Sequence, residues 1–225
     1  MLYKINSVFI FLFLYLVPFT AGETCVRYTF EQGFDELFSD KFELCASLNL
    51  PPWELGQYRT LGIPAPNAQS TSFMAPQPGN ESCTSSFLFP MQRGATIEVT
   101  LYLDPVHSLD EFMFLITHID PRSGLPWMSG VYIFSPSPWP FPSGWYTASF
   151  PIPGPSTPEG FLMVWAGGPR NPRMLIDSFR VIPPGMDESF CRLYEGNMRP
   201  LPALKYRAPE TIPKLKSFLK INDKL

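Results

Sequence analysis

The chain has 225 residues, a formal net charge of −3 and four cysteines. The small net charge argues against a nucleic-acid partner. Lys4, the apolar run 8–17 and the small residues up to Gly22 are typical of a secretory signal peptide. The run is too short to cross about 30 Å of hydrocarbon, and no later stretch is longer, so we expect no transmembrane segment. After cleavage, about 200 residues are left for a soluble, secreted, extracellular chain, enough for one domain.

Short β-rich runs separated by Pro, Gly, Ser and Asn follow in chain order. They cover residues 25–32, 86–89, 95–103, 111–119, 144–152, 160–166 and 174–181. Strands at this spacing predict an all-β, antiparallel β-sandwich. The apolar residues of 95–103 alternate with polar ones, which places them on one face; they are Ile97, Val99, Leu101 and Leu103.

The proline-rich stretches 51–78 and 135–158 are expected to form long surface loops, because proline cannot donate to a β-ladder. The domain is expected to span residues 23–191. Residues 192–225 combine prolines and many lysines with few apolar side chains, which predicts a basic, flexible tail. Its few apolar residues, such as Leu215, fit either a transient helix or a docking motif.

The four cysteines are an even number in an exported chain, which predicts two disulfides with three possible pairings. These cysteines are Cys25, Cys45, Cys83 and Cys191. The sequence holds no CxxC pair and no Cys/His cluster, so a zinc site is not expected. The sequon NES makes Asn80 a candidate glycosylation site on the surface.

Asp177 lies within the apolar run MLIDSFRV at 174–181. A period of two places it on one face with Leu175, Phe179 and Val181. A bare buried charge is costly, so the carboxylate needs partners, which could be a metal ion, a substrate or backbone N–H groups.

The order of several stretches resembles the MAM domain, an adhesion module of receptor and secreted proteins. The stretches are CVRYTFEQGF at 25–34, WEL at 53–55, CTSSFLFPMQRGATIEVTLYL at 83–103, GWYTASFPI at 144–152 and GFLMVWAGGPRNPRMLIDSFRV at 160–181, with Cys191 after them. The resemblance covers residues 25–191. It implies a jelly-roll-like, concanavalin A-like β-sandwich without catalysis.

The resemblance also implies that the first cysteine pairs with the second and the third with the fourth, which gives Cys25–Cys45 and Cys83–Cys191. It makes Asp177 a structural carboxylate that accepts hydrogen bonds from loop backbone and fixes one end of the sandwich. A calcium or sodium site and a ligand-binding or catalytic role are the alternatives. The chain departs from the family pattern in having Asp-Ser at 177–178 where the family has Asp-Asp.

The sequence offers little catalytic chemistry, because GxSxG, HExxH and a Gly-rich phosphate loop are all missing. We expect no enzyme activity and no cofactor. His118 is expected at a strand end, either on the surface or hydrogen-bonded. The acidic stretch 104–111, which includes His107, is expected to be a solvated loop, with weak cation binding as the alternative.

Exposed aromatic residues are common in binding surfaces. Trp139 and Phe141 lie among prolines in SPSPWPFPSGW at 135–145, which predicts either a displayed binding loop or rings that cover the end of the sandwich. The sequence as a whole predicts an extracellular binding or adhesion module that recognises a protein partner. A carbohydrate-binding, lectin-like protein is the alternative, and a glycan-acting enzyme is a weaker one.

Overall fold

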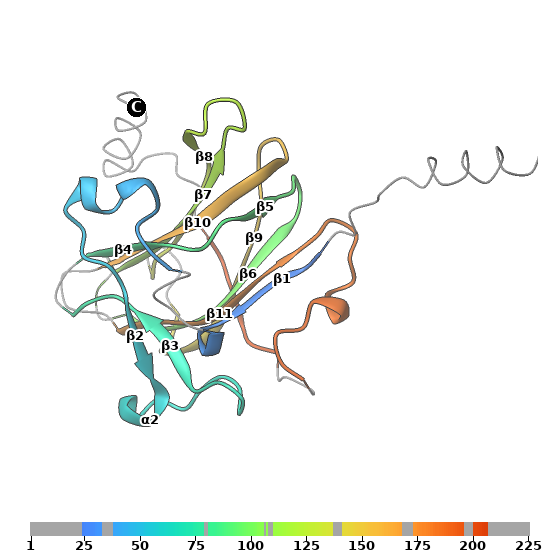
Figure 1. Ribbon diagram of the computed structural model, residues 1–225. Coiled ribbons are helices and arrows are strands. Elements are labelled where there is room, and N and C mark those ends of the chain that lie inside the picture. Colours follow the sequence, from blue (N-terminus) through green and yellow to red (C-terminus); the bar gives the residue numbers. More distant parts are fainter. Residues whose placement is uncertain are drawn as a thin grey trace, which may run out of the picture.

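The computed structural model describes residues 24–32, 38–78, 81–105, 107, 110–136, 141–167, 173–195 and 200–206. Two sheets pack face to face and form a sandwich (Figure 1), which confirms the predicted all-β fold. The larger sheet has the order β12-β9-β6-β11-β3-β2, with β1 also paired to β11. The smaller sheet has the order β4-β10-β7-β8, with β5 also paired to β10.

The larger sheet consists of β1 (Val26–Thr29), β2 (Glu54–Gln57), β3 (Ser72–Ala75), β6 (Thr96–Asp104), β9 (Gly144–Pro151), β11 (Arg173–Ile182) and β12 (Ala203–Leu204). The smaller sheet consists of β4 (Ser82–Ser85), β5 (Phe89–Met91), β7 (Glu111–Ile119), β8 (Pro126–Phe134) and β10 (Thr157–Gly167). The described helices are α2 (Tyr58–Leu61) and the 3-10 turns η1 (Phe30–Gln32), η2 (Lys41–Glu43), η3 (Ala46–Leu48) and η4 (Glu188–Cys191).

The main core lies between the two sheets. The alternation predicted for β6 is confirmed, since Ile97, Val99, Leu101 and Leu103 are all buried in this core. Aromatic rings connect the layers: Phe114 of β7 and Phe150 of β9 stack with their centroids 5.1 Å apart. The alternate residues of β6 and β9 face outward, and some of them form the floor of a groove on the outer face of the larger sheet.

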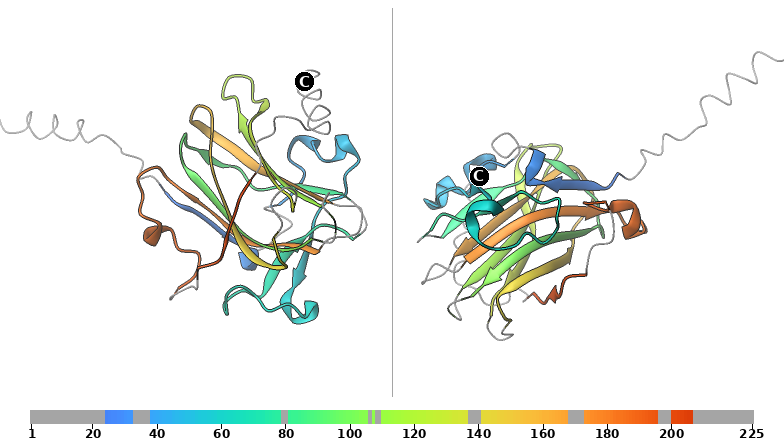
Figure 2. Two further views of the ribbon diagram at one scale, coloured as in Figure 1. Left: turned by 180° about the vertical axis from the view of Figure 1, so that it is seen from behind. Right: turned by 90° about the horizontal axis from the view of Figure 1, so that it is seen from below.

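The prediction of a long loop at 51–78 is wrong, because this stretch contains β2, α2 and β3. Its prolines flank these elements and leave their hydrogen bonds intact. Seen from below (Figure 2, right), β11, β6 and β9 lie side by side, with the segment β2–α2–β3 in front of one end. Tyr58 and Phe73 of this segment pack on Leu175, in a second apolar cluster outside the larger sheet.

The outer face of the smaller sheet is apolar and is covered by residues 38–50. Met113, Phe161 and Trp165 are buried there with Cys45 and Cys83. These two cysteines form a disulfide with Cα atoms 5.5 Å apart, which fastens the covering segment to β4.

The pairing of the disulfides corrects the one implied by the MAM resemblance. The bonds are Cys45–Cys83 and Cys25–Cys191, the latter with Cα atoms 5.6 Å apart. Cys25 precedes β1 in the larger sheet, whereas Cys45 lies over the smaller sheet. Cys25 therefore pairs with Cys191, which follows β11 of the larger sheet, and Cys45 pairs with Cys83 of β4 in the smaller sheet.

The chain after β11 continues as the C-terminal segment, a name used here for residues 183–195 and 200–206. The prediction of a flexible tail from residue 192 is wrong for its described part. Tyr194 is buried, and Leu204 belongs to the main core. Ala203 and Leu204 form β12 parallel to β9. Residues 207–225, with Leu215, lie outside the described residues. In the part of the chain that the structure describes, no helix has the length and apolar character needed to span a membrane.

Candidate binding surfaces beside the C-terminal segment

Asp177 occupies a β-bulge in β11, where the register with β6 shifts between Ile176 and Ser178. The extra residue reverses the alternation of side chains. Ile176 and Phe179 therefore both point into the main core, while Leu175 packs in the outer cluster. The prediction that Asp177 shares a face with Phe179 is wrong, because a strict period of two does not cross a bulge.

The carboxylate of Asp177 is 1% exposed and accepts hydrogen bonds from hydroxyl groups. Tyr58 donates to Oδ1 at 2.9 Å, while Tyr194 and Ser178 donate to Oδ2 at 2.8 and 2.9 Å. Ser70 in turn donates to the Tyr194 oxygen at 2.9 Å. Asp177 was expected to bind loop backbone. Instead it accepts hydrogen bonds from side chains of three parts of the chain: β11, the segment β2–α2–β3 and the C-terminal segment.

Burial raises the pKa of Asp177, and the surrounding hydroxyl groups, that of Tyr194 most of all, oppose this effect only in part. Burial and the neighbouring Asp177 also raise the pKa values of Tyr58 and Tyr194. Both tyrosines therefore remain protonated donors, and the network is structural in character.

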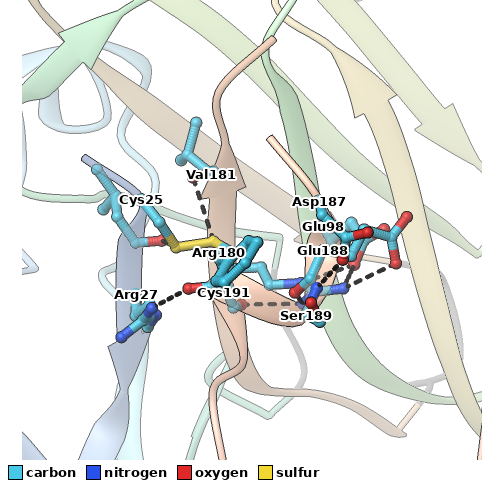
Figure 3. The surroundings of a disulfide bond; sticks show 11 residues. Cys25, Arg27, Glu98, Arg180, Val181, Asp187, Glu188, Ser189 and Cys191 are labelled. Carbon is cyan, nitrogen blue, oxygen red and sulfur yellow. Dashed lines mark hydrogen bonds and ion pairs between the residues drawn. A yellow bond between two sulfur atoms is a disulfide. The ribbon is translucent and has the colours of Figure 1, made fainter. Parts of the chain in front are cut away.

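Arg180 fixes the start of the C-terminal segment (Figure 3). Its Nε and Nη2 donate to Glu98 Oε2 of β6 at 2.9 and 2.6 Å. Its Nη1 donates to the carbonyl oxygens of Glu188 and Cys191 at 3.3 and 2.9 Å. One guanidinium thus ties η4 to the outer face of the larger sheet, beside the Cys25–Cys191 disulfide.

Phe190 projects from η4 with 72% of its surface exposed. The turn that carries it has an N-cap, because Asp187 accepts from the Ser189 amide at 2.8 Å. Arg27 of β1 donates to the Phe190 carbonyl oxygen. We call residues 187–192 the Phe190 knob. It is an exposed aromatic ring on a short turn held by a disulfide and two arginines.

Two hollows flank Leu193 and Tyr194 of the C-terminal segment. The first is a groove of about 420 Å³ on the outer face of the larger sheet, between the segment β2–α2–β3 and residues 200–203. The second measures about 650 Å³, is more open, and lies beside Phe190, Arg27 and Arg192. Sequence reasoning missed both, since they depend on a segment that it assigned to the tail.

The structure describes only one of the residues predicted for ligand contact and glycosylation. Trp139 and Asn80 lie outside the described residues. Phe141 is half-buried against the main core, with its ring edge to face on Tyr146 at 5.6 Å. This position agrees with the alternative that Phe141 covers the end of the sandwich.

His118 is fully buried, so the expectation of a surface position is wrong and that of hydrogen bonding is confirmed. Its Nδ1 lies 3.0 Å from Thr157 Oγ1, its Nε2 lies 3.1 Å from the Pro153 oxygen, and its ring stacks on Trp127. Burial lowers the pKa of His118. In the 104–111 stretch, Asp110 accepts from the His107 amide at 2.7 Å. Within the described ranges, no three His, Cys, Asp or Glu residues gather as a metal site.

No protein-family model matches the chain, and no curated protein matches it. Among solved structures, the chain is similar to the K1 cleaved adhesin domain of Lys-gingipain from Porphyromonas gingivalis W83. The TM-score is 0.48 at 9% identity, over 72% of this chain and 99% of that one. It is also similar to TmCBM61 in complex with beta-1,4-galactotriose, with a TM-score of 0.38 at 10% identity, over 69% and 94%.

A third similar structure is the family 11 carbohydrate-binding module from Clostridium thermocellum. The TM-score is 0.35 at 11% identity, over 73% of this chain and 92% of that one.

Proposed function

We propose that the chain is a secreted, non-catalytic binding module of the MAM type that recognises an extracellular protein partner through the Phe190 knob. The signal-like start and the two disulfides support export to an oxidising compartment. The buried titratable groups support a role without catalysis, since Asp177 is held by hydroxyls and His118 has a partner at each ring nitrogen.

The exposure of Phe190 is the observation on which the proposal rests. An aromatic ring that is 72% exposed has much apolar surface to bury. The disulfide and the bonds from Arg27 and Arg180 fix the turn beneath it, so little backbone entropy is lost on binding. A projecting ring fits a pocket on another protein, whereas small ligands bind in concave sites.

Replacing Phe190 by serine is expected to weaken partner binding at least about tenfold, which is about 1.4 kcal/mol. The melting temperature should remain unchanged, because the ring lies outside the core. The measurement is saturable binding of labelled protein to cell surfaces and extracellular matrix, with sedimentation velocity to detect self-association.

Leu125→Ser is the matched control, since Leu125 is an exposed apolar residue at 45% on the β7–β8 turn. It should bind like the wild type. Equal binding by Phe190→Ser and wild type would contradict the proposed surface. A lack of saturable binding to cells, to matrix and to a second copy would contradict the proposed function itself.

A further inference from the structure

The floor of the 420 Å³ groove consists of outward-facing residues on three adjacent strands. Glu98 of β6 pairs directly with Arg180 of β11 on one side and Ser149 of β9 on the other. Thr100 pairs in the same way with Thr147. The floor is therefore a small array of polar side chains on a rigid sheet, with its spacing fixed by the β-ladders.

The three hydroxyl groups of this floor are available to a ligand. Thr100, Thr147 and Ser149 are half-buried, and their side chains make no hydrogen bond to any other residue in the described part of the chain. Each hydroxyl can donate one hydrogen bond and accept others. Half-buried hydroxyls aligned in this way gain most from a ligand that offers both donors and acceptors.

The charges of the groove do not select an ion. Arg180 directs its donors at Glu98 and at the carbonyl oxygens of Glu188 and Cys191, so it has little left for an anion. Glu98 and Glu188, two carboxylates of the groove, both pair with Arg180, at 2.6 and 3.4 Å. Asp177 is saturated by hydroxyl donors. A neutral polar ligand therefore fits better than a phosphate or an ammonium group.

The walls of the groove add apolar surface without opening a strand edge. Pro66 lines one side, and Leu193, Pro200 and Leu201 line the other. β12 pairs with Thr147 and Ala148 at the outer edge of β9, so an added strand cannot pair with β9 at these two residues. A sugar ring suits this groove, because its C–H faces can pack on the apolar walls while its hydroxyl groups form hydrogen bonds with the floor.

From this arrangement we infer that the groove is a binding site for a neutral oligosaccharide, either free or attached to a glycoprotein. The volume of about 420 Å³ lies within the range of small-molecule sites. Phe190 does not line this groove, and the floor hydroxyls do not line the hollow beside Phe190, so different variants test the two proposals.

The test is a titration of ¹⁵N-labelled protein with short neutral oligosaccharides that contain glucose, galactose, mannose or N-acetylglucosamine. At least one sugar should shift the amide signals of Thr100, Thr147 and Ser149. The Thr100→Val, Thr147→Val double variant removes two hydroxyls without changing shape and should weaken binding at least about tenfold. Ser149→Ala provides a second variant should the first melt early, and it too should weaken binding.

Thr96→Val is the matched control, because Thr96 faces outward on the same strand but does not line the groove. It should bind like the wild type, as should Phe190→Ser. The same sugars coupled to a carrier protein test whether the ligand is a glycoprotein. If the protein binds only the coupled sugars, and the double variant loses this binding, the site is specific for glycoproteins. Absence of binding to both forms, or binding that survives the loss of the hydroxyls, would overturn the inference.

Discussion

Replacing Cys25 and Cys191 together by alanine is expected to lower the free energy of unfolding by up to about 5 kcal/mol. This bond spans 166 residues, and closing a long loop removes much entropy from the unfolded chain. Replacing Cys45 and Cys83, which span 38 residues, should cost up to about 4 kcal/mol in the same treatment. Urea unfolding followed by tryptophan fluorescence measures both.

The two double variants are controls for each other, since each removes one bond and leaves the other. The account predicts the larger loss for the Cys25–Cys191 pair, together with a less ordered Phe190 knob. A larger loss for the Cys45–Cys83 pair would contradict it. It would show that fastening residues 38–50 to the smaller sheet stabilises the domain more than linking β1 to the C-terminal segment.

Replacing Asp177 by alanine is expected to lower the free energy of unfolding by about 1–3 kcal/mol, because the buried hydroxyls of Tyr58, Tyr194 and Ser178 lose their acceptor. Asp177→Asn keeps one carbonyl oxygen and should cost less. Urea unfolding of the three proteins at one pH gives the comparison. An alanine variant as stable as the wild type would show that the carboxylate does not hold the three segments together.

The pH dependence of this effect has a definite sign. The pKa of Asp177 is raised in the folded state, so that state binds the proton more tightly than the unfolded chain. Its contribution to stability is fully present below the ordinary value of 3.8 and is lost as the pH rises through the raised value. The advantage of wild type over Asp177→Asn should therefore shrink from acid to neutral pH. An advantage that grows with pH would contradict the raised pKa.

Periodic apolar patterns allowed the long central strands to be predicted from sequence. β7 matches its predicted bounds, and Ile97 to Leu103 face the core as alternation requires. The strands that were missed include β2 and β3, which have only four residues each and lie between prolines, and the nine-residue β8. The bulge at Asp177 left no mark in the pattern, since inserting one residue changes the phase of a strand without changing its composition.

The candidate surfaces were beyond sequence reasoning for a related physical reason. The composition of residues 192–225 is that of a solvated tail, yet two buried residues, Tyr194 and Leu204, fasten its first part. Pairing of β12 with β9 depends on tertiary contact and involves only two residues. The docked segment carries the residues that wall the groove above the hydroxyls of Thr100 and Thr147. The one available signal was the position of Cys191 after the last long strand, which ties the following residues to the sandwich.

The central claim is that the C-terminal segment docks on the larger sheet and thereby builds the candidate surfaces. Hydrogen exchange at the backbone amide of Thr147 tests it most directly, because this amide donates to the Pro202 carbonyl oxygen at 3.0 Å. The account predicts that the Thr147 amide exchanges as slowly as the paired amides of β6. Exchange at the rate of an unprotected chain would show that residues 200–204 do not dock, and would contradict the account.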